Sequence, residues 1–282
     1  MTIIADSGST KTTWMDVETG NTLVTEGLNP HFTSDKKFQA TCFTVYEYFS
    51  ISNYTPKLFF YSAGCGSEAN NMRAKQLLTI VFKTDNVHVE TDMLGACRAV
   101  SGDQSGLVGI LGTGSNACYY DGKNVIKQAV STGYILGDHG SANHVGRKLL
   151  QDYLTGNMPV HLKSLFHEAY PQTKEDFLDA IYHQLNANRF LASLAKFAVN
   201  NIENEYCSST LSLSLIDWGK YQLFDLCEKT NCNDLYLVGG FASRIKRSFL
   251  DNFARDHNLI IKKVIDNPIE GLREYHQKHD ML

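Results

Sequence analysis

The fold is decided by residues 3–17, which read IIADSGSTKTTWMDV. The short apolar run at 3–5 is typical of a buried strand, and apolar/polar alternation resumes over 14–17. Between them lie a carboxylate, a glycine and several hydroxyls. The stretch therefore predicts a β-hairpin with a small polar turn, and the second turn at 19–21 predicts that a third strand follows over 22–28.

The chemistry of the first turn suits an anion. Gly8 has no Cβ to block close approach, so the turn can aim backbone N–H groups and hydroxyls at a ligand. Asp6, at the end of the strand, could hold a hydrated divalent cation. A Walker P-loop is excluded because Thr10 precedes Lys11, and a dinucleotide fingerprint because the turn opens into a strand. An ordinary Ser/Thr/Gly turn would give the same pattern.

Composition narrows the class of protein. A chain of 282 residues predicts two domains, and a net charge of -4 without a basic run predicts no nucleic-acid or membrane-surface partner. We find no signal-like segment and no apolar run of the roughly 18 residues that a membrane span needs. The seven cysteines include no C-x-x-C pair and the ten histidines are scattered. We therefore expect reduced thiols in a cytoplasmic protein and no histidine-rich metal site.

The opening pattern returns in the second part of the chain. Before it, strands at 57–61 and 87–90 alternate with helices at 35–49, 70–82 and 93–100, which predicts a mixed sheet with helices. An apolar strand at 106–111 then leads into the small polar turn 112–116 and a strand at 117–120, with Asp121-Gly122 as a hairpin signal. Two such hairpins predict a duplicated domain plan, with turns that could clamp a polyphosphate.

The remaining segments add two polar junctions. Asp138 precedes a helix with apolar positions at 142, 145, 149 and 153, and it could simply cap that helix. Residues 159–230 are predicted to be helical, including a packed helix at 211–227, with no assigned chemistry. After a strand at 234–238, Gly239 and Gly240 could let a flat ring lie on the backbone or make a tight connection to a helix at 244–257. A strand at 259–264 and a terminal helix starting near Pro268 complete the prediction.

Four segments taken together resemble a known superfamily. DSGSTKT (6–12), GTGSN (112–116), GDHGSA (137–142) and VGGFA (238–242) are similar to the phosphate 1, phosphate 2 and adenosine motifs of actin, hexokinase and Hsp70. More closely, the chain resembles the N-acetylglucosamine kinase branch, which is grouped with the ATPases that activate benzoyl-CoA reductase and 2-hydroxyacyl-CoA dehydratase. The resemblance covers nearly the whole chain. It implies an α/β fold of two ribonuclease-H-like (actin-like ATPase) domains with an interdomain cleft: residues 1–105 plus a terminal helix at about 268–282, and residues 106–267.

The same resemblance implies roles for the matching residues. Asp92, in a Thr-Asp pair at the end of a strand, would be the catalytic base, although it could also cap the next helix. Asp6 would anchor Mg²⁺, through water. The residues implied to bind ATP are Gly8, Ser9, Thr10, Lys11, Thr113, Gly114, Gly239, Gly240 and Ala242. The residues implied to bind the sugar are Asn29, Asn116, Asp138 and Ala142. His139 stands where such kinases often have Glu.

The function implied is ATP-dependent phosphorylation of an N-acetylated hexosamine, most simply N-acetylglucosamine to its 6-phosphate, with N-acetylmuramic acid as a variant. One alternative is an activator ATPase that couples hydrolysis to electron transfer through a bridging Fe–S cluster. That role needs cysteines that meet across a dimer axis, and Cys97 and Cys118 lie in the right part of the chain but not in such a motif. A nucleotide-binding regulator without catalysis is a third possibility. A homodimer is the habit of the family.

Overall fold

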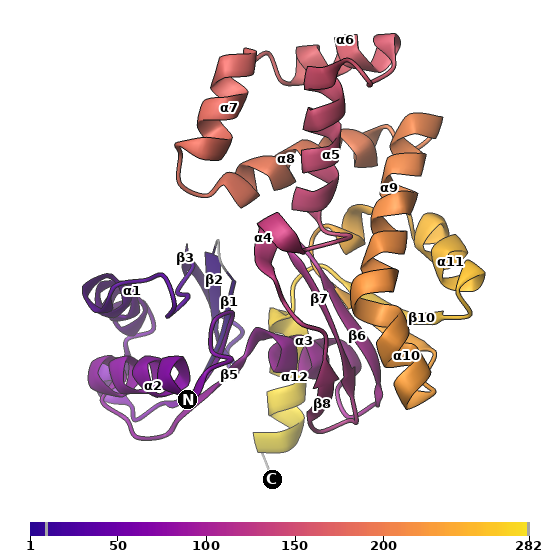
Figure 1. The fold of residues 1–282 in the computed structure, drawn as a ribbon. Coiled ribbons are helices and arrows are strands. Elements are labelled where there is room, and N and C mark those ends of the chain that lie inside the picture. The colour runs from indigo at the N-terminus through magenta and orange to yellow at the C-terminus, as the bar shows by residue number, and fades with distance from the viewer. Residues whose placement is uncertain (9–10, 281–282) are drawn as a thin grey trace. The chain divides into compact units, whose positions relative to one another are not determined.

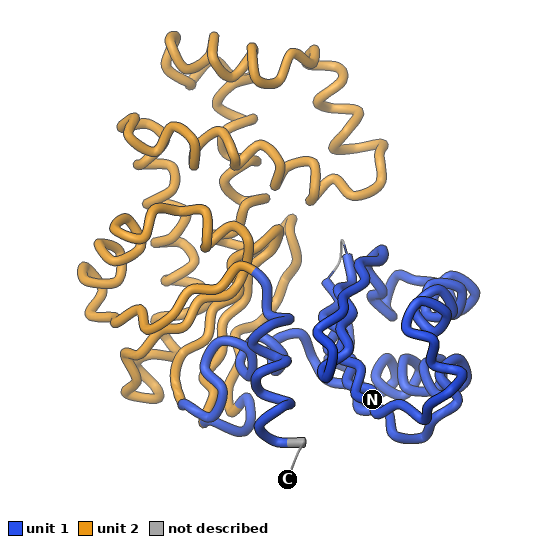
Figure 2. The backbone as a smooth tube through the Cα atoms, turned by 180° about the vertical axis from the view of Figure 1, so that it is seen from behind, with its two compact units in different colours: residues 1–104, 122–125, 267–282 blue, residues 105–121, 126–266 orange. Residues whose placement is uncertain are grey.

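The computed structural model describes residues 1–8 and 11–280. The chain divides into two compact units, coloured separately in Figure 2. Unit 1 comprises residues 1–104, 122–125 and 267–282, and unit 2 comprises residues 105–121 and 126–266. Within the described part of the chain, no helix combines the length and apolar character needed to cross a membrane.

Unit 1 is built on a five-stranded sheet of order β3-β2-β1-β4-β5. Its strands are β1 (Thr2–Ser7), β2 (Lys11–Asp16), β3 (Thr22–Glu26), β4 (Lys57–Ser62) and β5 (Val87–Thr91). The first three form the predicted antiparallel meander, and β4 and β5 extend the sheet in parallel with β1. The register places Ser7 opposite Ser62 and Ser62 opposite Thr91, so the carboxyl ends of three parallel strands meet at one edge.

Helices cover both faces of this sheet because its buried strands are apolar on both sides. The helices of unit 1 are α1 (Asp35–Tyr48), α2 (Glu68–Phe82), α3 (Asp92–Ser101) and α12 (Ile269–Asp280), with a 3₁₀ turn, η1 (Ile51–Asn53). In β4, Leu58 and Phe60 join the core formed with α1 and α2. The alternate residues face α3 and α12: Phe59 lies 3.9 Å, centroid to centroid, from His276, and Tyr61 lies against Gly95. This alternation is the period of two expected of a strand.

Unit 2 repeats the plan with the sheet order β10-β9-β6-β7-β8. The strands are β6 (Gly106–Leu111), β7 (Ser115–Tyr120), β8 (Val125–Gln128), β9 (Asp234–Val238) and β10 (Ile260–Ile265). β6 and β7 are antiparallel, whereas β9 pairs with β6 and β10 in parallel. A hairpin-led meander extended by two parallel strands thus occurs twice, which confirms the predicted duplication.

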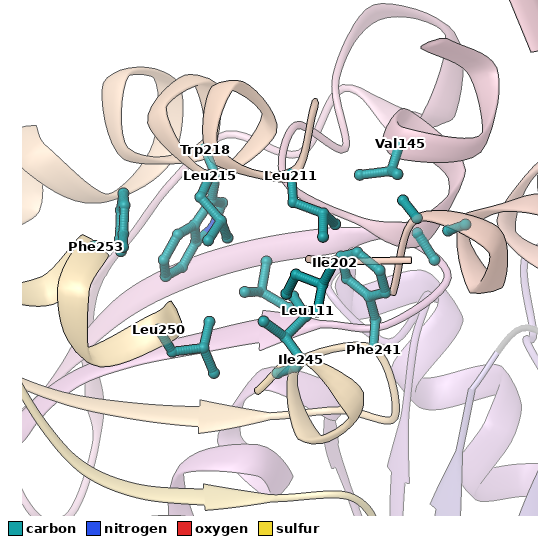
Figure 3. Packing of buried hydrophobic residues seen from close by; sticks show 14 of the residues in the cluster. Leu111, Val145, Ile202, Leu211, Leu215, Trp218, Phe241, Ile245, Leu250 and Phe253 are labelled. Carbon is teal, nitrogen blue, oxygen red and sulfur yellow. The ribbon is translucent and has the colours of Figure 1, made fainter. Parts of the chain in front are cut away.

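Most of the helical content belongs to unit 2. Its helices are α4 (Gly133–Leu136), α5 (Ala142–Thr155), α6 (Val160–Ala169), α7 (Lys174–Tyr182), α8 (Ala187–Asn200), α9 (Glu205–Trp218), α10 (Phe224–Thr230) and α11 (Arg247–Asp256), with a π-helical turn, η2 (Gly219–Leu223), and a 3₁₀ turn, η3 (Ala242–Arg244). Helices α5 to α8 gather at one end of the unit (Figure 1). Leu211, Leu215 and Trp218 of α9 pack on the strands in the core drawn in Figure 3.

Two predicted helices differ in detail, and one short helix is new. The helix predicted at 211–227 is interrupted by η2, where the hydrogen-bond pattern widens by one residue. The helix predicted to start at 244 starts at Arg247, because Ile245 and Lys246 have extended backbones with ψ of 135° and 130°. The short helix α4 was not predicted.

Candidate functional site

Two carboxylates lie at the edge of unit 1 where the parallel strands end. Asp6 is the penultimate residue of β1, and Asp92 follows β5 as the first residue of α3. Burial raises the pKa of Asp6 to about 7; the charge of Asp92 adds to the rise, and Lys11 opposes it. Burial also raises the pKa of Asp92, against the lowering effect of the Met93 N–H, which donates to its carboxylate at 2.9 Å. The structure thus brings the predicted base and the predicted metal ligand within electrostatic reach of each other.

Capping of α3 is not the task of Asp92. Thr91 is the N-cap residue, and its hydroxyl accepts from the Leu94 N–H at 3.2 Å. The alternative that Asp92 serves as the cap is therefore wrong. As the first residue of the helix, Asp92 lies where the helix dipole favours a negative charge.

The turn after β1 divides its hydroxyls between two tasks. Ser7 and Thr12 are fully buried, with their oxygens 2.8 Å apart, and both accept from the Leu28 N–H. These two hydroxyls hold the segment that leaves β3. The turn itself closes through the Gly8 N–H, which donates to the Lys11 carbonyl at 3.0 Å.

Lys11 is exposed at the start of β2, and its charge reaches Asp6, whose pKa it lowers. Ser9 and Thr10, which were also predicted to bind ATP, lie outside the described residues.

Asn29 lies beside the loop that follows β4. Its side-chain oxygen accepts from the His31 N–H at 2.8 Å, so Asn29 makes a local turn. A Cβ on Gly64 would come within 2.1 Å of that oxygen, so the side chain packs directly on the glycine. The candidate sugar ligand is therefore buried against the loop leaving the carboxyl end of β4, the same sheet edge that carries Asp6.

In unit 2, the loop between β6 and β7 is fastened to the start of α5 by its carbonyls. The Gly112 carbonyl accepts from Ala142 N–H at 3.0 Å, and the Thr113 carbonyl accepts from the N–H and the side-chain amide of Asn143 at 3.2 and 2.7 Å. In a trans peptide, the C=O and the N–H of the next residue point in opposite directions. The N–H groups of Thr113 and Gly114 therefore point away from α5, an arrangement suited to an anion.

Asp138 lies against this loop. One carboxylate oxygen accepts from the Ser115 N–H at 3.3 Å, and the other accepts from the side-chain amide of Asn143 at 3.0 Å. A Cβ on Gly114 would lie 2.7 Å from the carboxylate, so only glycine fits there without movement. Burial raises the pKa of Asp138, while the two hydrogen bonds lower it.

The alternative role of Asp138, the N-cap of α5, is wrong. The cap is Ser141, whose hydroxyl accepts from the His144 N–H at 3.3 Å. Asp138 itself has a φ of +51°, an uncommon conformation for a residue other than glycine, and it turns the chain so that its carboxylate meets the loop. Strained backbone of this kind is often found at functional sites.

Two other predicted sugar ligands have local partners. The side-chain oxygen of Asn116 accepts from the Ala117 N–H at 2.8 Å. The side chain of Ala142 is buried in the core, and its N–H is used by Gly112. Ala142 thus contacts the loop through its backbone N–H and not through its side chain.

The glycines after β9 reach the same loop. Gly239 has a φ of +130°, which favours glycine, and a Cβ there would lie 2.4 Å from the Leu111 carbonyl oxygen. Gly240 is flanked by Arg244, which donates to its carbonyl at 2.9 Å, and by the Asp266 carboxylate. The candidate adenosine motif (residues 238–242) and the candidate phosphate 2 loop, the loop between β6 and β7, are therefore neighbours.

Ala242, also predicted to bind ATP, begins the 3₁₀ turn η3, and its side chain is fully buried in the core of unit 2.

Sequence reasoning missed three residues of the site in unit 2. Ser115 belongs to the GTGSN motif but received no role, although it joins the loop to Asp138. Asn143 follows the GDHGSA motif by one position, where adjacency was the only available signal. Gln222 hydrogen-bonds Ser115 from 107 positions away, and no sequence signal marks it.

The residues present fit a nucleotide with Mg²⁺. Among residues 1–8 and 11–280, no group of three or more His, Cys, Asp or Glu side chains is arranged to hold a metal ion. Mg²⁺ in nucleotide sites is usually held by one or two carboxylates plus phosphates and water, so a dedicated cage is not needed. Asp6 supplies such a carboxylate. Burial and the neighbouring Asp92 raise its pKa, and a bound cation would lower that pKa again.

Comparison with known proteins places this geometry in a family. No protein-family model and no curated protein sequence matches the chain. Two similar solved structures carry the name "putative N-acetylglucosamine kinase". The one from Porphyromonas gingivalis is 30% identical over 99% of this chain and 100% of its own, with a TM-score of 0.92. The one from Chromobacterium violaceum is 17% identical over 97% and 98%, with a TM-score of 0.73.

A ROK family glucokinase from Streptomyces griseus, solved with glucose and AMPPNP, is 14% identical over 98% of both chains, with a TM-score of 0.62. The two likenesses below 25% identity show the fold, the predicted two-domain α/β fold of actin-like ATPases. The likeness to the Porphyromonas protein, at nearly full coverage of both chains, shows more than the fold. The chain belongs to the N-acetylglucosamine kinase-like family of the actin/hexokinase/Hsp70 superfamily.

Proposed function

We propose that this protein transfers the γ-phosphoryl group of ATP to a hydroxyl of an N-acetylated hexosamine, most simply forming N-acetylglucosamine 6-phosphate and ADP. The observation that carries the proposal is the pair Asp6 and Asp92 at the carboxyl edge of the unit 1 sheet. Phosphoryl transfer needs positioning and charge neutralisation more than covalent help from the protein, and one carboxylate for each task is sufficient.

Asp92 is the proposed general base. As a carboxylate it takes the proton of the sugar hydroxyl while that oxygen bonds to the γ-phosphorus and the bond to the β-phosphate oxygen breaks. The raised pKa of Asp92 makes it a stronger base than an ordinary aspartate, which suits proton abstraction near neutral pH. A positioned base of this kind contributes about 10²–10⁴-fold to the rate.

The proposed nucleotide ligands are distributed over both units. Mg²⁺, when bound, neutralises phosphate charge, and Asp6 is its proposed ligand, with Gly8 and Lys11 at the adjoining turn. In unit 2, the N–H groups of Thr113 and Gly114 are proposed to face the phosphates, and the backbone at Gly239 and Gly240 to face the adenosine. Asp138 and Asn29 are proposed to bind sugar hydroxyls, with Asn116 beside them. The partners are thus small molecules, and we place the reaction in the cytoplasm, where ATP is available.

An activator ATPase with a bridging Fe–S cluster is disfavoured by burial. Cys97 and Cys118, the cysteines considered for that role, are both completely inaccessible to solvent within a single chain. A cluster shared across a dimer axis requires thiolates at the surface. Both thiols lie inside the chain, so neither could bind a cluster at a dimer surface.

A coupled ADP-release assay over a panel of sugars tests the proposal. We expect turnover with one N-acetylated hexosamine among N-acetylglucosamine, N-acetylmannosamine and N-acetylmuramic acid, and little with glucose. Asp92→Asn should lose at least 10²-fold in kcat while still binding ATP. Asp85→Asn, an exposed aspartate just before β5, is the matched control and should behave as the parent protein. Full activity in Asp92→Asn would remove this residue from the mechanism.

A further inference from the structure

A π-helical turn lies behind the candidate phosphate 2 loop. It separates α9 from α10 and spans Gly219–Leu223. π-helical turns are rare and occur frequently at functional sites. Residues 219–223 belong to no sequence motif, and the sequence alone predicts no role for them.

Two consecutive residues of this turn contact the two segments that form the site in unit 2. The ring of Tyr221 stacks on His139 at 4.2 Å between centroids with an interplanar angle of 24°. The side chain of Gln222 is only 5% exposed, and its amide oxygen Oε1 lies 3.2 Å from the Ser115 hydroxyl oxygen. The turn thus supports the loop at Ser115 and the Asp138-His139 segment at the same time.

Hydrogen-bond accounting defines what Gln222 does. The Ser115 hydroxyl has one proton, and it lies 2.6 Å from the His139 carbonyl, which can only accept. The proton therefore goes to His139, which would leave the Ser115 oxygen facing Gln222 Oε1 at 3.2 Å with no proton between them. Turning the amide by 180° about its last side-chain bond exchanges Oε1 and Nε2, so that Gln222 donates an N–H to Ser115, and we assign this orientation from the network. A glutamine can make this bond, whereas an ionised glutamate cannot.

The position of Ser115 determines the positions of groups that are proposed to contact the ligands. Its N–H donates to Asp138 at 3.3 Å, and it directly follows Gly114, which packs on the same carboxylate. A shift of Ser115 would therefore move both the N–H groups of the loop and the Asp138 carboxylate.

We infer that Gln222 is a positioning residue that acts through Ser115 to hold the phosphate 2 loop and Asp138 in register. The inference rests on the proposed function, because it takes the loop at 112–114 as a phosphate ligand. Gln222 touches neither nucleotide nor sugar in this account, and its effect is transmitted by one hydrogen bond from a donor amide.

The test compares Gln222→Glu with Gln222→Met, which keeps the length and removes the donor. Methionine should lower kcat/KM by about tenfold at every pH, the effect of losing one neutral hydrogen bond. Glutamate should match methionine at pH 8.5 but recover toward the parent as pH falls to 6, because only the protonated carboxyl can donate to Ser115, and burial should raise its pKa into this range.

Other titratable groups surround this network. Burial lowers the pKa of His139, and burial together with Arg147 lowers the pKa of His144 to about 4, so the His144 ring is neutral above pH 6. The acids nearby are Asp138 and, beside the two histidines, Asp217. The parent protein, measured over the same range, removes their common contribution.

Two controls separate positioning from a general loss of stability. Gln151→Glu, on the exposed side of α5, should show no pH-dependent recovery. The double variant Ser115→Ala/Gln222→Met should be no worse than Ser115→Ala alone, since Gln222 acts through Ser115. If Gln222→Glu follows Gln222→Met at every pH, or if the two losses multiply in the double variant, the inference is wrong.

A binding measurement keeps this test distinct from that of the kinase proposal. The affinity for Mg·AMPPNP, measured by calorimetry, needs no sugar and should follow the same pH pattern in Gln222→Glu. A parent protein that turns over no sugar but shows this pattern would refute the kinase proposal alone. A parent protein that turns over a sugar, with a Gln222→Glu variant that shows no pattern, would refute the positioning role alone.

Discussion

The Asp6 carboxyl should make the folded protein sensitive to pH between about 4 and 7. Its pKa is raised from 3.8 to about 7, first by burial and then by Asp92. The pKa of Asp6 is higher in the folded protein than in the unfolded chain. The contribution of Asp6 to the free energy of unfolding is therefore complete below pH 3.8 and is lost as pH rises through 7. By linkage the loss amounts to about 4 kcal/mol at most. Asp6 is partly exposed to solvent, which screens its charge, so we expect about 2 kcal/mol.

Asp6→Asn keeps the shape of the side chain and removes the charge. In the presence of a chelator, the variant should melt roughly 5 °C above the parent at pH 8, and at the same temperature as the parent at pH 4. Differential scanning calorimetry from pH 4 to 8.5 measures the difference. Asp85→Asn, in the same unit but exposed, should leave the parent's pH dependence unchanged.

Adding Mg²⁺ with ADP should reverse the order at pH 8. A bound cation stabilises the ionised Asp6, so the parent should gain stability, whereas the asparagine variant should gain much less. The reasoning fails if Asp6→Asn is no more stable than the parent at pH 8 without metal, or if both proteins respond equally to Mg·ADP.

Three further substitutions follow from single contacts. Thr91→Ala removes the cap of α3, so it should lower the free energy of unfolding by about 1 kcal/mol, measured by thermal unfolding, and should also lower kcat. Thr91→Ser keeps the capping hydroxyl and should leave both near the parent values. Gly114→Ala places a Cβ 2.7 Å from the Asp138 carboxylate and should lower kcat/KM in the ADP-release assay at least tenfold, whereas Gly66→Ala, with nothing within 4 Å, should be silent. Gly271→Ala puts a Cβ 2.1 Å from a backbone carbonyl of α3 and should lower the free energy of unfolding by about 2 kcal/mol, as chemical denaturation would show.

The doubled hairpin plan could be predicted because it depends on local patterns. Apolar runs that end in glycine and hydroxyl turns specify a strand and the turn that closes it, and both hairpins occur where the pattern placed them. Asp92 could be placed at a strand end for the same reason. Its proximity to Asp6 then followed from parallel pairing, which aligns the carboxyl ends of strands.

What escaped prediction depends on contacts between residues distant in sequence. The local pattern before α5 favoured Asp138 as its cap, but a φ of +51° turns Asp138 to the loop and leaves the cap to Ser141. Only the fold brings Gln222 to Ser115, and a π-helical turn has no reliable sequence signature. The motifs supply the residues of the site, whereas the residues that hold them in place come from segments without any motif.

Identification of the phosphorylated product tests the central claim most directly. The purified protein is incubated with ATP, Mg²⁺ and each N-acetylated hexosamine in turn, and the products are followed by phosphorus NMR. The account predicts a sugar phosphate, with N-acetylglucosamine 6-phosphate as the first expectation, formed in equal amount to ADP and at least 10²-fold more slowly by Asp92→Asn. Formation of ADP and inorganic phosphate without a sugar phosphate from any of these sugars would contradict it.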